Sequence, residues 1–287
     1  MSTSRSEARS WYMTGVALLV VSAITYSTAG LFTKGVEAGA WAVIFWRGVF
    51  AAMSTTAWIA AQGSFRKEFL GMGRAGLVVG VIGAIGTAAF IPAFKLTSIA
   101  NVALIYAIAP LIAALLAWLA IRERVGKRTA LGAACALLGV AVIVAGSIGT
   151  PNLVGDGLAL VMTTAMATIM VVYRARPDTP SAGPSILQSL LLFPAALAFG
   201  APLQTDPVEI AILAAFGILF AIASVTLAEG AKRVPAGQTA LLGALETPLA
   251  PILAFLILAD VPPAATLIGG GIVLMAVVVS IREKPTD

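Results

Sequence analysis

The chain has 287 residues, of which 60% are hydrophobic and 11% are charged, and its net charge is +5. A soluble domain carries about 25% charged residues, so a soluble chain this apolar would expose hydrophobic patches and aggregate. The absence of histidine and the presence of a single cysteine exclude Ser-His-Asp hydrolases, Cys-His proteases, histidine-ligated zinc sites and an internal disulfide. We therefore interpret the chain as an integral membrane protein and expect no metal or other cofactor.

Apolar stretches follow one another along the whole chain, and most have the length of about 20 residues that crosses a bilayer as a helix. We expect ten transmembrane helices, in chain order at Trp11–Phe32, Trp41–Ala60, Arg74–Phe94, Ile99–Ile121, Arg128–Ser147, Asp156–Tyr173, Pro184–Ala201, Val208–Ala228, Gly237–Leu258 and Ala264–Ile281. The expected fold is an all-α, multi-pass membrane protein that lies in a lipid bilayer.

Basic residues are concentrated in every second connection between these stretches. On the side of the two termini lie Arg5, Arg9, Arg66, Lys67, Arg74, Arg122, Arg124, Lys127, Arg128, Arg174, Arg176, Lys232, Arg233, Arg282 and Lys284. The opposite side has only Lys34 and Lys95. Because basic loops remain in the cytoplasm, we expect both termini to be cytoplasmic. The scatter of these residues over short loops argues against a nucleic-acid partner.

The second half of the chain repeats features of the first. The stretch Lys95–Val142 aligns without a gap with Lys232–Val279. Matched positions include a lysine, an acidic residue and a glycine in each copy: Lys95 and Lys232, Glu123 and Asp260, Gly132 and Gly269. We expect two five-helix repeats, at residues 1–150 and 151–287. Because each has an odd number of spans, the second repeat is inverted relative to the first, as in many secondary transporters.

Several of these stretches resemble the EamA family of the drug/metabolite transporter superfamily. They are the segment from Pro110 through Trp118 to Glu123, its echo from Glu246 and Pro248 to Asp260, the glycines Gly132, Gly139 and Gly269–Gly271, Lys34 near the end of the first span, and Arg47 in the second. One departure is Val261-Pro-Pro after Asp260, where the family more often has Gly-Glu-Arg. The chain is most similar to bacterial aromatic amino-acid exporters. The resemblance implies a monomer of ten helices in the bacterial inner membrane that exports amino acids and related small metabolites.

Two ionisable residues lie well inside expected spans and are the first candidates for a substrate site. Charged groups within a bilayer are costly and usually face the interior of the helix bundle. An amino acid needs a partner for its carboxylate and another for its ammonium group, and Arg47 and Glu246 could supply them. A structural ion pair, or a side chain that reaches for the membrane surface, is the alternative interpretation.

Polar side chains within the spans form a second group of candidates. An unpaired amide is expensive in hydrocarbon and must face another helix or a hydrated cavity. The candidates are Tyr26, Asn101, Tyr106, Thr168, Gln188 and Gln238. Pro110 and Pro248 lie near matching positions of the two repeats and interrupt helical hydrogen bonding, so we expect them to act as hinges. A static kink fits the sequence equally well.

Three classes of function are compatible with a polytopic membrane protein. A secondary transporter fits the repeats, the polar groups within the spans and the absence of a G-x-x-x-x-G-K-[ST] motif. An intramembrane enzyme would need an acid/base or metal constellation that the sequence does not offer, so we expect no enzyme. A channel normally draws rings of charge from oligomeric symmetry. We expect an exporter of amino acids that works by alternating access. The alternative is an efflux carrier of the same superfamily with another drug or metabolite substrate.

Overall fold

The computed structural model describes residues 2–145, 152–258 and 264–281, and regular structure in that part is entirely helical. Asp260 lies outside it. The helices of the first half are α1 (Ser2–Tyr26), α2 (Ala29–Lys34), α3 (Ala40–Ala61), α4 (Phe65–Leu70), α5 (Gly73–Leu96), α6 (Ile99–Tyr106), α7 (Ala109–Ile121) and α8 (Lys127–Val144). Those of the second half are α9 (Leu153–Ala175), α10 (Ala182–Phe199), the 3-10 turn η1 (Pro202–Gln204), α11 (Pro207–Ala231), α12 (Ala236–Gly243), α13 (Glu246–Leu258) and α14 (Ala264–Ile281).

Within the described residues, eight segments are long and apolar enough to cross a membrane. They are Glu7–Thr33, Ala40–Ala61, Gly73–Leu96, Asn101–Ile121, Leu153–Ala175, Ala182–Phe199, Pro207–Ala231 and Ala264–Ile281. The expected count of ten is therefore not confirmed. The two remaining sequence stretches form α8, which begins with two charged residues, and the pair α12–α13, which is interrupted. α12 and α13 have 8 and 13 residues, the same lengths as α6 and α7, which together form the span Asn101–Ile121.

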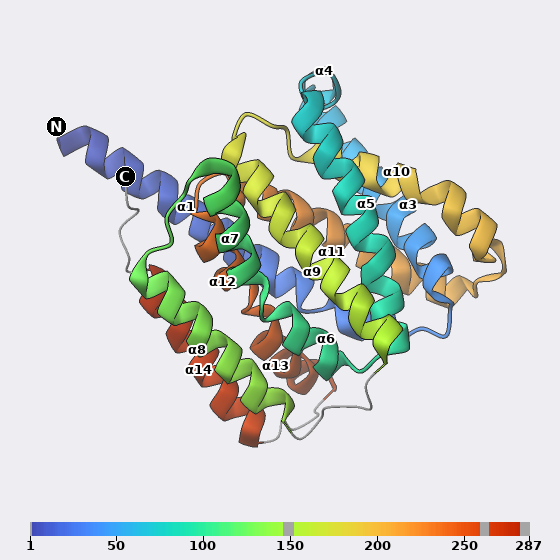
Figure 1. Ribbon diagram of the computed structural model, residues 1–287. Coiled ribbons are helices and arrows are strands. Elements are labelled where there is room, and N and C mark those ends of the chain that lie inside the picture. The colour runs from blue at the N-terminus through green and yellow to red at the C-terminus, as the bar shows by residue number, and fades with distance from the viewer. Residues whose placement is uncertain (1, 146–151, 259–263, 282–287) are drawn as a thin grey trace.

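The helices pack in pairs that recur between the two halves of the chain. α1 packs on α11 and α5 on α9; α3 packs on both α10 and α11, and α10 packs in turn on α5. If α1 corresponds to α9, α3 to α10 and α5 to α11, each contact has a counterpart in the other half. α8 and α14 form a separate pair, which lies side by side on one flank of the bundle (Figure 1).

Glycines allow α8 and α14 to approach closely. A Cβ atom on Gly139 would lie 2.7 Å from the carbonyl oxygen of Gly269, so neither position has room for a larger residue without a shift of backbone. In a bilayer the hydrophobic effect does not drive helices together, and close packing of small residues replaces it. The outward faces of the same helices carry exposed leucines such as Leu138 and Leu267, as a lipid-facing surface requires.

The two ends of the bundle can be distinguished by which loops meet there. Tyr12 in α1 donates a hydrogen bond to the carbonyl of Ile281, the last residue of α14, over 3.4 Å. We call this the terminal end; the connections α7–α8, α9–α10 and α11–α12 lie there too, since Glu123 contacts both Arg174 and the amide of Ala236. The opposite, far end joins the α2–α3 and α10–α11 connections, where Glu209 accepts hydrogen bonds from the amides of residues 37 and 38.

Candidate functional site

Three of the long helical segments are interrupted inside the bundle. Single tight turns separate α1 from α2, α6 from α7, and α12 from α13. In each turn the backbone closes with short-range hydrogen bonds, as in the 3.2 Å bond from Ile108 to Ile105 and the 3.1 Å bond from Leu245 to Leu242. Pro110 and Pro248 lie in the first turns of α7 and α13, directly after two of these interruptions. Proline is tolerated there because the first amides of a helix have no partner within it. Whether they move as hinges stays a prediction.

Three of the expected site residues stand at these interruptions. Tyr26 is the last residue of α1, Tyr106 the last of α6, and Glu246 the first of α13. Interrupted helices in transporters place polar groups and helix ends near the middle of the membrane, where the substrate binds. Each interruption therefore contributes one of these side chains, from the end of α1, the end of α6 or the start of α13.

Tyr106 faces Glu246 across two interruptions. The phenol and the carboxyl group interact electrostatically, and the hydroxyl is buried without a geometrically sound hydrogen bond to any described residue. A Cβ atom on Gly243 would lie 3.1 Å from this hydroxyl, so the glycine leaves room for the tyrosine. Tyr106 and Gly243 occupy aligned positions of the two repeats. The large residue of one repeat thus fills the space left by the small residue of the other.

Among the described residues, Arg47 in α3 is the largest side chain that is completely buried, with 1% of its surface exposed. Its Nη2 donates to the hydroxyl of Thr87 in α5 over 3.4 Å, whereas Nε and Nη1 have no partner within the described part of the chain. The guanidinium lies 3.7 Å from the ring centroid of Phe220 and 5.6 Å from that of Phe216, both in α11. Cation–π contacts offset part of the cost of desolvating a cation, but they do not replace an anion.

Helix α11 comes close enough to place these rings because Gly217 lies between them. A Cβ atom on Gly217 would lie 2.6 Å from the carbonyl oxygen of Arg47, so α3 and α11 touch through their backbones at the level of the arginine. Phe216 and Phe220, one turn apart, then project beside the guanidinium. Gly217 therefore allows the close approach of α3 and α11 on which the site depends, and helix formation does not need it.

Tyr26 is a neighbour of both charged groups. Its phenol interacts electrostatically with both Arg47 and Glu246, and its ring meets Phe220 edge to face with centroids 5.8 Å apart. Ion pairs within 4.0 Å in the described part of the chain involve only surface-proximal groups, so Arg47 and Glu246 do not form one. Tyr26 and Glu246 are partly exposed, whereas Arg47 and Tyr106 are buried. The arrangement offers a buried cation, a separate carboxyl group and an aromatic wall.

Two other expected site residues lie at the ends of the bundle. Asn101 donates to Thr97 over 3.1 Å and to Asp156 of α9 over 3.4 Å. Gln238 accepts from Tyr12 of α1 over 3.0 Å and donates to the carbonyl of residue 280. Asn101 and Gln238 are aligned in the two repeats, and each ties its short helix to the first helix of the other half. Their hydrogen-bonding groups are thus used within the protein.

Thr168 and Gln188 complete the expected set. The hydroxyl of Thr168 donates to the carbonyl of Thr164 in its own helix over 2.7 Å, which is how a threonine in a membrane helix satisfies itself. Gln188 in α10 packs its amide against Gly83, one turn before Thr87 in α5, and thus lies on the helix face that also meets Arg47. The structure brings together Tyr26, Arg47, Tyr106 and Glu246, with Gln188 at their margin.

Thr87, Phe216 and Phe220 also neighbour the site, and the sequence does not mark them as candidates. An aromatic pair spaced by four residues in an apolar helix looks like ordinary packing, and only the intervening Gly217 could have drawn attention to it. A second polar cluster, around Glu229 at the terminal end, is equally inconspicuous in the sequence, because its members lie at helix ends and resemble solvated loop charges.

Comparisons with known proteins agree with this architecture. The model of the EamA-like transporter family matches the chain twice, at residues 13–145 and at residues 153–282. A solved structure titled "Crystal structure of protein" aligns with 96% of this chain and 96% of its own, with a TM-score of 0.74 and 22% sequence identity. At that identity the likeness shows the fold alone. No curated protein matches the sequence.

Proposed function

We propose that this chain, which belongs to the EamA-like transporter family, exports amino acids and related small metabolites by alternating access. Members of this family are small-molecule transporters of the drug/metabolite superfamily rather than enzymes, and membership implies a small-molecule substrate and the lipid bilayer as partners. Our proposal adds the substrate class, aromatic and other apolar amino acids. It also places the chain in the bacterial inner membrane as a monomer with both termini in the cytoplasm.

The observation that carries the substrate proposal is the uncompensated charge of Arg47. A buried guanidinium with two unpartnered nitrogens costs several kcal/mol, and a carboxylate with bidentate geometry would offset that cost. Glu246 supplies a separate carboxyl group that can accept an ammonium group. Because Tyr26 interacts electrostatically with both groups, they belong to one neighbourhood, and a ligand that binds both would carry both charges. An α-amino acid has that form.

The aromatic neighbours of Arg47 support an apolar side chain on the substrate. Phe216, Phe220 and Tyr26 present ring surfaces beside the guanidinium, and aromatic ligands gain edge-to-face or stacked contacts from such walls. We expect phenylalanine, tryptophan and tyrosine to be better substrates than small polar amino acids. A drug or metabolite without both charges is the alternative substrate class within the same family.

The recurring helix contacts support two inverted repeats, divided between residues 150 and 151. We propose that α8 and the pair α12–α13 complete ten spans, and that the interruptions before Pro110 and Pro248 allow the repeats to rock against each other. In such transporters access alternates when one group of helices moves relative to the other around a fixed central site.

Substrate analogues test the role of each charge. The purified protein is reconstituted in liposomes, and counterflow of labelled phenylalanine is measured in competition with phenethylamine, which lacks the carboxylate, and phenylacetate, which lacks the ammonium group. We expect each analogue to compete at least about tenfold more weakly than phenylalanine, the loss of one charge-assisted contact. In Arg47→Gln, the disadvantage of phenethylamine should disappear, and in Glu246→Gln that of phenylacetate.

A matched control removes a charge elsewhere. Arg124 is exposed in the α7–α8 connection, so Arg124→Gln should keep the analogue preference of the unmodified protein. Indifference to every amino acid in the panel, with saturable transport of another metabolite, would replace the amino-acid proposal by the alternative. Equal loss of all three competitors in Arg47→Gln would contradict the assignment of the carboxylate to this residue.

A further inference from the structure

The polar cluster at the terminal end contains a lysine whose counterpart in the other repeat lies at the opposite end of the bundle. Lys95 at the end of α5 and Lys232 after α11 are aligned in the repeats. Each reaches the connection that follows the first helical segment of its own half. Lys95 donates to the carbonyl of Val36 over 2.9 Å, and Lys232 donates to the hydroxyl of Ser181 over 2.8 Å. At each end of the bundle, a lysine from the end of a helix thus holds one of the connections by a hydrogen bond.

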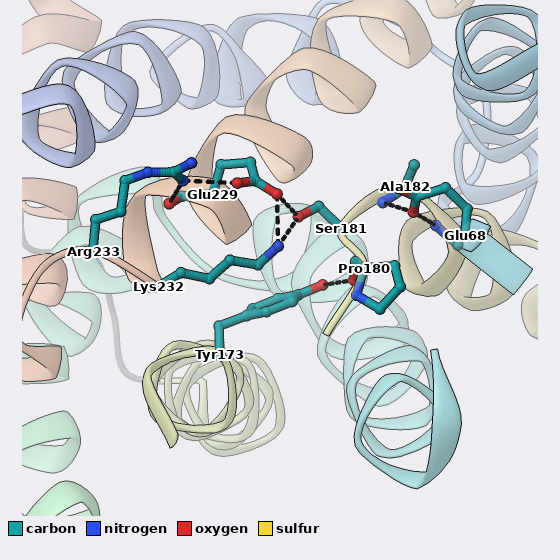
Figure 2. A network of polar contacts seen from close by, with 9 residues as sticks. Glu68, Tyr173, Pro180, Ser181, Ala182, Glu229, Lys232 and Arg233 are labelled. Atoms are coloured by element: carbon teal, nitrogen blue, oxygen red, sulfur yellow. Dashed lines mark hydrogen bonds and ion pairs between the residues drawn. The ribbon is translucent and has the colours of Figure 1, made fainter. Parts of the chain in front are cut away.

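At the terminal end, the carboxylate of Glu229 also contacts the lysine. Glu229 pairs with Lys232 over 2.6 Å and with Arg233 over 2.7 Å, and it also accepts a hydrogen bond from the hydroxyl of Ser181 (Figure 2). The position aligned with Glu229 in the first repeat is Pro92, which has no carboxylate. Charge-assisted hydrogen bonds to a shared carboxylate are about twice as strong as neutral ones.

This cluster, formed by Ser181, Glu229, Lys232 and Arg233, joins two sides of the bundle. On one side, Arg233 lies over the ring of Trp11 in α1, with its guanidinium carbon 4.3 Å from the ring centroid. On the other, the connection that carries Ser181 is fastened to α9, where the hydroxyl of Tyr173 donates to the carbonyl of Pro180 over 3.4 Å (Figure 2). The cluster therefore links the α1–α11 pair to the α5–α9 pair.

We propose that the Glu229 cluster is a latch that holds the terminal end closed and must open during each transport cycle. The proposal rests on alternating access, because separation of the α1–α11 pair from the α5–α9 pair at this end would pull Ser181 away from Glu229 and Lys232. Glu229 acts as a positioning residue: it does not touch the central site around Arg47, and it sets how readily the terminal end opens.

Glu68 offers a matched control in the same region. It accepts hydrogen bonds from the amides of Ala182 and Gly183 over 2.9 and 3.0 Å, which caps the start of α10 beside the latch (Figure 2). This contact involves α4 and α10 and does not reach the α1–α11 pair. Loss of its charge should weaken the cap of α10 without releasing the latch.

Distances between spin labels test the proposal without a substrate. Cysteines replace the exposed residues Arg9 of α1 and Asp178 of the α9–α10 connection, in a chain with Cys135→Ala. We expect Glu229→Gln to raise the population of longer distances roughly fivefold, the effect of a partly exposed charge network. Glu68→Gln should keep the distribution of the unmodified chain. An unchanged distribution in Glu229→Gln, or the same shift in Glu68→Gln, would overturn the latch.

A reversible cross-link tests whether the latch must open. In a Ser181→Cys and Lys232→Cys chain, again with Cys135→Ala, a short bifunctional methanethiosulfonate should stop phenylalanine counterflow, and reductant should restore it. Either single cysteine treated in the same way should retain transport. Full transport by the cross-linked chain would refute the proposal. If phenylalanine is not a substrate, the untreated chain shows no counterflow while the distance shift remains, so failure of the proposed substrate is distinguishable.

Discussion

The central site and the terminal latch both contain basic residues, but only those of the latch are paired with a carboxylate. At the centre, two nitrogens of Arg47 have no partner in the described part of the chain, and the nearest groups are aromatic rings and one hydroxyl. In the latch, one carboxylate binds two cations and a hydroxyl. A buried charge without a partner is typical of a binding site, because a ligand of opposite charge can pair with it. A charge that is paired at a helix end instead holds two parts of the protein together.

Burial sets the energetic scale of the two regions. Arg47 is 1% exposed, so its desolvation is nearly complete, whereas the Glu229 side chain is 31% exposed and solvent screens its pairs. An unpaired buried ion costs several kcal/mol, while a partly exposed pair stabilises by about 1 kcal/mol or less. Removal of the central charge and removal of the latch charge should therefore change the free energy of unfolding in opposite directions.

The largest effect is expected for Arg47→Met. The apolar side chain has similar length and removes an uncompensated cation, so the free energy of unfolding should rise by about 1–3 kcal/mol. Transport of phenylalanine should fall by more than about a hundredfold, since a lost charge-assisted bidentate contact is worth about 3 kcal/mol. Unfolding temperature in detergent, followed by tryptophan fluorescence, measures the first change and counterflow the second. A less stable variant would show instead that the charge of Arg47 is compensated within the protein.

A smaller effect of opposite sign is expected for Glu229→Gln. The amide can still accept from Ser181 but no longer pairs with Lys232 and Arg233, so the free energy of unfolding should fall by about 0.5–1 kcal/mol. Added salt should reduce this difference, because screening weakens the pairs in the unmodified chain. The unfolding temperature of both chains is compared at low and high ionic strength. A salt-independent difference would mean that packing, not charge, sustains the latch.

Ionisable and helix-breaking residues explain why part of the site could be predicted from the sequence. Arg47 and Glu246 are conspicuous because charge is costly within apolar stretches. The proximity of Tyr26 and Tyr106 to them follows from the interruptions at the ends of α1 and α6, and only the proline after the second one was visible in the sequence. The roles of these four residues in transport stay predictions.

Other residues show where sequence reasoning reaches its limit. A buried amide requires a partner, but the requirement does not say whether the partner is a substrate or the protein itself. Asn101 and Gln238 find theirs in Asp156 and Tyr12. Their alignment in the two repeats was a signal for a shared structural role. Phe216 gives no such signal, since its position beside Arg47 depends on how closely α3 and α11 pack.

The fold was more accessible than the site, because bilayer thickness and backbone hydrogen bonding leave few choices for an apolar chain. The family match confirms that the EamA domain is present twice. Eight spans could be recognised by length and composition in the described residues, and α8 and the pair α12–α13 are not among them.

The smallest effect is expected for Thr168→Val, which tests whether a polar side chain in a span must belong to the site. The hydroxyl of Thr168 bonds to the carbonyl of Thr164, which already takes part in the helix, so its removal leaves no orphaned donor or acceptor. Valine has the same shape, and phenylalanine counterflow should stay within about twofold of the unmodified chain, below the factor of five that 1 kcal/mol produces. A clear loss of counterflow with unchanged unfolding temperature would place Thr168 at the substrate and extend the central site along α9, away from the Arg47 neighbourhood.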